Sequence, residues 1–258
     1  MSEIVAVLDR PERIGPVLDV ASAYAELLGS ELVVYAAPEV LGTAGIAVYP
    51  SVHAVHRLRR GRPGWVASAA ARPGVELVVV TATDVEHGGW GVDLLQECPA
   101  SVLVVPDAVT SYDIVVPARV LVPLDGSAES TAAVTESMDL FATSGAEVVV
   151  LHVFDQSTAP AFWDQPVHAQ RSWGEEFLAR HVHGPGIRLE LRTGSPGEEV
   201  VAVALAEGAD LIALGWSRDL SGGRARTVRN AVGQASVPVL LVPLAATGRG
   251  RREREGSG

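Results

Sequence analysis

The acidic side chain best placed for chemistry is Asp125, which directly follows the apolar run 119–124. Such a run predicts a buried strand that delivers a carboxylate at its carboxyl end. Ser127 or Asp125 can cap the helix expected to follow. The apolar face of that helix is expected to use Ala132, Met138 and Phe141. Because open α/β sheets bind ligands beyond the carboxyl ends of their strands, Asp125 is the first candidate for a ligand contact.

A second candidate site follows the apolar strand expected at 209–214, where glycine and arginine are frequent. Glycines let backbone N–H groups approach phosphate oxygens, and the N-terminus of a helix favours negative charge. Arginines can add charge-assisted hydrogen bonds to a phosphate. The candidate residues are Gly215, Arg218, Gly222, Gly223, Arg226 and Thr227. The alternative is an ordinary solvated arginine face that binds nothing.

Catalytic and metal sites are not predicted. No Ser/His/Asp order or pair of carboxylates indicates a catalytic set, so we expect no enzyme. His181 and His183 lack carboxylate partners and are expected to be solvated. Cys98 is the single cysteine, which excludes an intramolecular disulfide framework and indicates an inert, partly buried thiol. The tryptophans are expected to pack in the core, although Trp216 is close enough to the expected crevice to stack on a base.

The composition indicates a folded protein of one large or two small domains. The chain has 258 residues, 48% of them hydrophobic. Its net charge of −11 argues against a general nucleic-acid-binding surface. An apolar strand is expected from Ile4 without a basic leader, and no apolar run approaches the roughly 20 residues that span a bilayer. We therefore expect a cytoplasmic protein without a membrane segment.

Two copies of one α/β unit follow each other along the chain. The matching pairs are 4–9 with 119–125, 58–64 with 191–197, and 99–106 with 236–243. Repetition at this scale indicates a duplicated fold. Strands so uniformly apolar predict a parallel sheet that helices cover on both faces.

The two copies are expected to differ in length. We predict a first domain at 1–110 that lacks one helix, a fuller second domain at 111–246, and a disordered tail at 247–258. The piece missing from the first domain corresponds to 162–182, which is expected to be helical. In the second domain, Ser195, Pro196 and Glu198 are expected to begin a helix with a capping box.

The second copy resembles the universal stress protein family in the order and spacing of its motifs. These motifs occupy 122–127, 150–153, 194–197, 210–215 and 237–243, and the first copy matches more weakly through 7–9, 61–64 and 102–106. The resemblance implies two tandem, doubly wound domains, each with a five-stranded parallel sheet of strand order 3-2-1-4-5. It also implies that the domains pair edge to edge through their last strands, which would cover two sticky edges within one chain. Such an intramolecular pseudo-dimer can pair further into a homodimer.

The resemblance also assigns residues to a nucleotide site. ATP-binding members hold adenine beside the aspartate after the first strand and a valine that ends the second strand. Carried over by position, these residues are Asp125 and Val153, with Pro123 and Leu124 beside them.

After Leu214, this sequence departs from the phosphate-binding loop of those members. The family motif is Gly, two residues, Gly, nine residues, Gly and Ser or Thr, followed by a helix. Gly215 matches the first glycine, but Arg218 occupies the position of the second. Ala225 and Arg226 fall where the last glycine and the serine would be. The nucleotide motif is therefore incomplete.

Two functional hypotheses remain open. The first is a stress-response protein whose second domain binds ATP or a related adenine nucleotide, with Mg²⁺ accompanying it and occupancy altering a protein partner. The second is a regulatory scaffold of the same fold that binds no nucleotide. ATP hydrolysis, at most slow, ranks last because no residue is placed to orient a water. The first domain is expected to have lost its site, since acidic Asp84 and Glu86 in its loop would repel phosphate.

Overall fold

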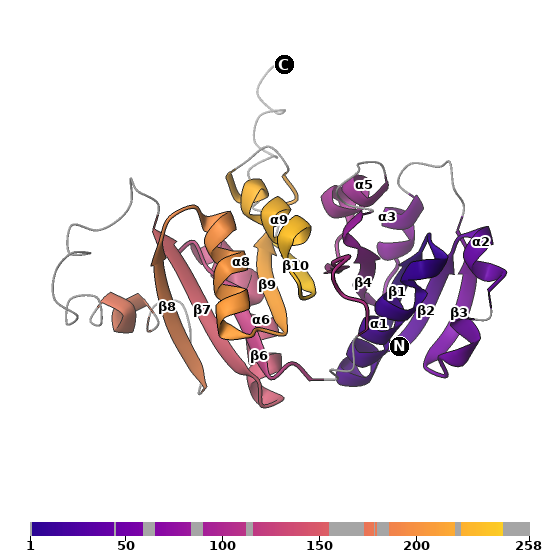
Figure 1. Ribbon diagram of the computed structural model, residues 1–258, viewed down its shortest axis with the longest axis horizontal. Helices are drawn as coiled ribbons and strands as arrows, with labels where there is room; N and C mark the ends of the chain where they lie inside the picture. The colour runs from indigo at the N-terminus through magenta and orange to yellow at the C-terminus, as the bar shows by residue number, and fades with distance from the viewer. Residues whose placement is uncertain are drawn as a thin grey trace, which may run out of the picture.

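The strands of the chain form one continuous sheet. The computed structural model describes residues 2–43, 45–58, 65–83, 90–111, 116–154, 173–177, 179, 186–219 and 223–244. Within these residues, ten strands are hydrogen-bonded in the order β3-β2-β1-β4-β5-β10-β9-β6-β7-β8. Figure 1 shows the first half of the chain, indigo to magenta, beside the second half, pink to yellow.

The first half contributes five parallel strands in the order β3-β2-β1-β4-β5. Its elements are β1 (Glu3–Leu8), the 3-10 helix η1 (Pro11–Arg13), α1 (Ile14–Leu28), β2 (Glu31–Ala36), α2 (Pro38–Leu41), the 3-10 helix η2 (Ile46–Val48), β3 (Val52–Arg57), α3 (Trp65–Ala70), β4 (Val75–Thr81), α5 (Trp90–Glu97) and β5 (Ser101–Val105). The central strand β1 is buried from Ile4 to Leu8, as expected for a sheet covered on both faces.

The second half repeats this order as β8-β7-β6-β9-β10. Its elements are β6 (Arg119–Pro123), α6 (Ala128–Thr143), β7 (Glu147–Phe154), β8 (Ile187–Thr193), α8 (Pro196–Glu207), β9 (Leu211–Trp216), α9 (Gly223–Gln234) and β10 (Val239–Pro243). Numbered within each half, both sheets have the strand order 3-2-1-4-5. The tandem, doubly wound α/β fold is thereby confirmed.

The two halves join through their last strands. β5 and β10 are antiparallel, with Leu103 opposite Leu240 at the centre of the pairing. This contact confirms the predicted edge-to-edge pairing within one chain. The strands that would each be an open edge of a five-stranded sheet thus become the middle of a ten-stranded one.

Chain direction determines which face of the sheet each helix covers. Parallel crossovers are right-handed, so connections that run in opposite directions along a sheet place their helices on opposite faces. α6, between β6 and β7, therefore covers the face opposite to α8, between β8 and β9. Figure 1 shows α8 and α9 in front of the second half of the sheet and α6 behind it.

The start of α6 follows the prediction only in part. Ser127 is the N-cap, because its Oγ accepts a hydrogen bond from the N–H of Ser130 at 3.1 Å. Met138 and Phe141 are buried as predicted, but Ala132 is exposed, and this part of the prediction is wrong. Val134 takes its place in the buried face. A helix following a strand can rotate about its axis by the angle that lets its larger side chains reach the sheet.

The predicted capping box of α8 is also wrong in part. Ser195 is the N-cap residue and Pro196 follows it in the first turn, as predicted. The side chain of Ser195 makes no capping hydrogen bond, however, so the reciprocal pair with Glu198 does not form. The glutamate still lies in the first turn, where its charge favours the helix dipole.

Several predictions concern segments that the structure describes only in part. Of the helix expected over 162–182, residues 173–177 are helical, and most of the remainder lies outside the described residues. His181, His183 and the tail 247–258 also lie outside them. The domain limits at residues 110 and 246, and the helix missing from the first half, stay predictions.

Candidate functional site

A cavity of about 90 Å³ lies at the carboxyl ends of β6, β7 and β9 in the second half. Six of the ten predicted site residues line it: Pro123, Leu124, Asp125, Val153, Gly215 and Thr227. They come from β6 and the turn after it, from β7, from β9 and from α9. The parallel order of the strands brings their carboxyl ends to one edge, which is why residues distant in sequence meet here.

Asp125 lies at the mouth of this cavity. Its side chain is exposed, and its Oδ1 accepts a hydrogen bond from the N–H of Ser127 at 3.0 Å. This turn, in which an aspartate bonds the backbone two residues later, fixes the carboxylate just before α6. Gly126 between them has a φ of 81°, a left-handed conformation that glycine adopts without strain. The sequence Asp-Gly-Ser thus holds an acidic group beside the opening.

His152 supports the same turn from β7. Its Nδ1 lies 2.8 Å from the backbone oxygen of Leu124, one residue before Asp125. The imidazole ring packs against Phe154, Trp173 and Phe177, with ring centroids 4.6, 5.3 and 4.9 Å away. The aromatic cluster therefore fixes the histidine, and the histidine fixes the turn that carries the acid.

Gly215 brings β9 unusually close to its neighbours. A Cβ atom at this position would lie 3.1 Å from Ser130 Oγ and 3.2 Å from Leu244 Cδ2. Both contacts are closer than an ordinary van der Waals distance, so the close approach requires glycine. Ser130, from the first turn of α6, also lines the cavity. Sequence reasoning missed Ser130, although its position three residues after the N-cap signals that it lies at the strand ends.

Arg218, Gly223 and Arg226 are not among the described lining residues. Arg226 is exposed on α9, and Gly223 is the first residue of that helix. Arg218 has a φ of 61°, and its guanidinium lies 3.5 Å from the backbone oxygen of Pro99 in the first half. Gly222 lies outside the described residues. The cavity therefore gathers the predicted base-side residues more completely than the predicted phosphate-side residues.

The part of the chain that forms this cavity is similar to a known protein family. The model of the universal stress protein family matches residues 118–243, which contain β6 to β10 and the cavity. The second half of the chain is therefore a universal stress protein domain.

Solved structures extend the similarity to the whole chain. A universal stress protein from Archaeoglobus fulgidus is 14% identical, with 94% of this chain and 97% of that chain covered and a TM-score of 0.64. A putative universal stress protein from Pseudomonas aeruginosa is 15% identical, with 95% and 94% covered and a TM-score of 0.66. At these identities the similarity shows the fold, and it extends that fold to the first half. No curated protein matches the chain.

The suggestion that Trp216 could stack on a bound base is wrong. Its side chain is 1% exposed, and its indole Nε1 donates a hydrogen bond to the backbone oxygen of Leu95 at 2.8 Å. Because the indole is enclosed between the two halves, it presents no face to the cavity. The tryptophan is a packing residue.

The carboxyl ends of the strands in the first half have different chemistry. Asp9, the counterpart of Asp125, lies 3.8 Å from the Nε of Arg10. The buried guanidinium of Arg13 donates to the backbone oxygens of Pro106 at 2.8 Å and Val109 at 3.1 Å. Arg13 thus joins η1, directly before α1, to the segment after β5.

Other candidate chemistry is limited within the described part of the chain. No group of three His, Cys, Asp or Glu side chains there could hold a metal ion. None of the helices described is long and apolar enough to cross a membrane. Cys98 is buried, and burial raises the pKa of its thiol, against smaller opposing effects of a backbone hydrogen bond and of Arg218. A raised pKa keeps the thiol protonated and unreactive.

Proposed function

We propose that this chain is a stress-response regulatory protein whose second half binds ATP or a related adenine nucleotide in the cavity at the ends of β6, β7 and β9. The observation that carries the proposal is that residues predicted to contact the base and residues predicted to contact the phosphates line the same cavity. Pro123, Leu124, Asp125 and Val153 form the base side, and Gly215 and Thr227 form the phosphate side. Mg²⁺ would accompany the phosphates of the nucleotide.

The chemistry of the lining suits a purine nucleoside. Leu124 and Val153 provide apolar surface for a base, and Asp125 provides an acceptor for an amino or hydroxyl group at the mouth. α9 begins at Gly223 near Thr227, so its N–H groups and dipole favour an anion on that side. Arg226 directly precedes Thr227, and its exposed side chain can reach phosphates that face the solvent.

A second candidate function is favoured by the size of the cavity. Ligand pockets for small molecules usually enclose about 300–1,000 Å³, whereas this cavity encloses about 90 Å³. A nucleotide would therefore have to displace groups at the opening or leave its phosphates outside. The alternative is a regulatory scaffold of the same fold that acts through protein contacts without a nucleotide.

Ligand-dependent stability distinguishes these two functions. Thermal unfolding of the full chain is measured with ATP and Mg²⁺, with ATP and EDTA, and with GTP and Mg²⁺. A ligand at about 100 times its dissociation constant stabilises the folded state by about 2.7 kcal/mol. Stabilisation by ATP but not by GTP supports adenine binding. An unchanged melting temperature in millimolar ATP favours the scaffold.

Variants then test the assignment of the cavity. Asp125→Ala and Arg226→Ala are each expected to weaken ATP binding, measured by titration calorimetry. Asp139→Ala is the matched control, because Asp139 is an exposed carboxylate on α6 outside the cavity lining. If ATP binds the two site variants as tightly as the control, the nucleotide does not use this cavity.

The proposal includes no enzymatic role beyond slow ATP hydrolysis. It also includes a cytoplasmic location and an intramolecular pseudo-dimer that is able to form a homodimer. A protein partner would respond to nucleotide occupancy.

A further inference from the structure

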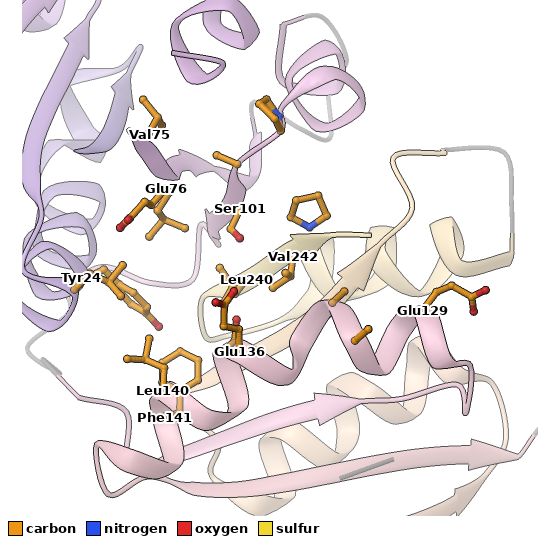
Figure 2. A pocket seen from close by; sticks show the side chains of 18 of the residues that line it. Tyr24, Val75, Glu76, Ser101, Glu129, Glu136, Leu140, Phe141, Leu240 and Val242 are labelled. Carbon is orange, nitrogen blue, oxygen red and sulfur yellow. The ribbon is translucent and has the colours of Figure 1, made fainter. Parts of the chain in front are cut away.

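A groove of about 1020 Å³ lies on one face of the sheet between α1 of the first half and α6 of the second half. Figure 2 shows Tyr24 from α1 near Leu140 and Phe141 from α6, with Leu240 and Val242 from β10 in the floor. α1 packs mainly on β1 and β4, and α6 packs mainly on β9. β5 and β10 therefore form the part of this face between the two helices.

The width of the uncovered strip suits one chain segment. Neighbouring strands lie about 4.8 Å apart, so two strands expose a strip of about 10 Å. This is about the diameter of a helix with its side chains, or of an extended segment with side chains on both edges. The duplicated fold leaves this strip because β5 and β10 are the last strands of their halves, while α1 and α6 pack mainly on β1, β4 and β9.

The groove has an acidic rim. The charged residues in its lining are Glu76, Glu129 and Glu136, and no arginine or histidine is among the described lining residues. Glu76 already accepts hydrogen bonds from the hydroxyls of Ser2 and Ser30 at 2.8 and 3.3 Å.

Glu129 and Glu136 have a different position. They are seven residues apart on α6 and so lie on one side of that helix, about 10 Å apart along its axis. Both side chains are exposed, and Figure 2 shows Glu136 next to Leu240. Two carboxylates thus border an apolar floor at a spacing that one short cationic segment can match.

The chain supplies such a segment directly beyond β10. Pro243, the last residue of β10, lines the groove, and the N–H of Leu244 still donates to the backbone oxygen of Trp216 at 2.8 Å. The residues that follow include Arg249, Arg251, Arg252 and Arg254 against Glu253 and Glu255. Residues 249–255 carry four positive and two negative charges, a net charge of +2, whereas the other residues of the chain together carry −13.

We propose that the C-terminal segment 249–254 binds in this groove, with its guanidinium groups on Glu129 and Glu136 and its side-chain stems over the apolar floor. Five residues lie between Pro243 and Arg249, and an extended chain spans at most about 20 Å over these six steps. Pro243, Glu129 and Glu136 all line the groove. Guanidinium groups pair well with carboxylates in two-pronged geometry. Arginine stems also bury apolar surface while the charged end remains hydrated. The segment then covers the strip of sheet that β5 and β10 leave open.

Paramagnetic relaxation in the full-length chain tests this proposal. A spin label is attached to Ser257→Cys, since the native Cys98 is 2% exposed and does not compete for the label. The label is expected to broaden the amide signals of Ala132, Ala133 and Leu140, which line the groove, and to leave those of β8 unchanged. The broadening is expected to disappear in 1 M salt, where the Debye length falls from about 10 Å to about 3 Å.

Charge variants and mixing experiments decide between occupants. Glu129→Gln with Glu136→Gln is expected to abolish the broadening. Asp139→Asn with Glu198→Gln removes the same charge from exposed positions outside the groove and is expected to leave it intact. In a mixed sample, one set of chains carries the spin label and a separate set carries the isotope label. Broadening that appears only in this mixed sample would assign the groove to a second copy of the chain and overturn the proposal. Unbroadened groove signals, or broadening that survives loss of both glutamates, would overturn the proposal. None of these results depends on nucleotide binding.

Discussion

The indole nitrogen of Trp216, at the end of β9, lies 2.8 Å from the backbone oxygen of Leu95 in α5, and this hydrogen bond joins the two halves of the chain. The last four carbonyls of a helix have no partner within that helix. The N–H of Cys98 donates a hydrogen bond to the carbonyl of Leu94, and the indole N–H of Trp216 donates one to the carbonyl of Leu95. A side chain from the second half therefore completes the end of a helix in the first half.

We expect Trp216→Phe to lower the free energy of unfolding by about 1–3 kcal/mol, because it leaves a buried carbonyl unpaired. The measurement is urea denaturation monitored by circular dichroism. Trp173→Phe is the control, because Trp173 is only partly buried and stacks on Phe177 at 5.0 Å between centroids. A loss no larger than in the control would show that the bond between the halves contributes little.

Arg13 is expected to be a second large contributor to stability. Its side chain is 10% exposed, and its guanidinium donates to the backbone oxygens of Pro106 and Val109. We predict that Arg13→Met lowers the free energy of unfolding by roughly 1–3 kcal/mol, because these carbonyls lose a charged donor. Arg10→Met is the matched control, since Arg10 is 38% exposed and its ion pair with Asp9 is 3.8 Å long. Equal losses in the two variants would contradict the assignment.

The lowered pKa of Glu147 predicts that the protein loses stability as the pH falls into the acid range. Hydrogen bonds from Arg188 and then from Arg119 hold the pKa of this carboxyl below its ordinary value. A lowered folded-state pKa contributes stability above the unfolded value of about 4.3 and loses it as the pH falls through the folded pKa. Wild type should therefore lose more unfolding free energy than Glu147→Gln between about pH 5 and pH 3. Because these three side chains are partly exposed and screened by solvent, the difference should be about 1 kcal/mol or less.

The control for this titration is Glu198→Gln, which removes an exposed glutamate from α8. It removes a negative charge without removing contacts to arginine, because the structure records no ion pair to Glu198 among the described residues. Parallel pH profiles for wild type and Glu147→Gln would contradict the predicted role of the arginine pair.

Sequence alone was sufficient for most of the fold. The apolar runs that end in Asp9 and Asp125 locate the first strand of each half, and the family resemblance supplies the strand order and pairing that the structure confirms. These features are predictable because they depend on apolar runs and on their order along the chain. Asp125 was predicted at a strand end for the same reason, whereas Val153 was assigned through the family resemblance.

The remaining details depend on contacts between distant residues. Trp216 packs as predicted, but the added suggestion of base stacking was wrong because nothing near it in sequence reveals Leu95, which lies 121 residues earlier. Arg218 likewise turns towards Pro99, and a motif comparison within one half cannot include that neighbour. Ser195 has the composition of a capping serine, yet its rotamer makes no capping bond. Motifs thus predict which backbone segments meet more reliably than they predict where polar side chains point.

The close approach at Gly215 supports a final prediction about the cavity edge. Gly215→Ala would place a Cβ atom 3.1 Å from Ser130 Oγ and 3.2 Å from Leu244 Cδ2, so these side chains must shift by a few tenths of an ångström. Such overpacking typically costs about 1–3 kcal/mol, measurable by chemical denaturation. Gly15→Ala is a control with the opposite sign, since its nearest neighbour is 4.0 Å away and α1 should gain about 0.4–1 kcal/mol. If Gly215→Ala is neutral or stabilising, the strand ends are loosely packed, and the cavity can widen around a ligand without cost.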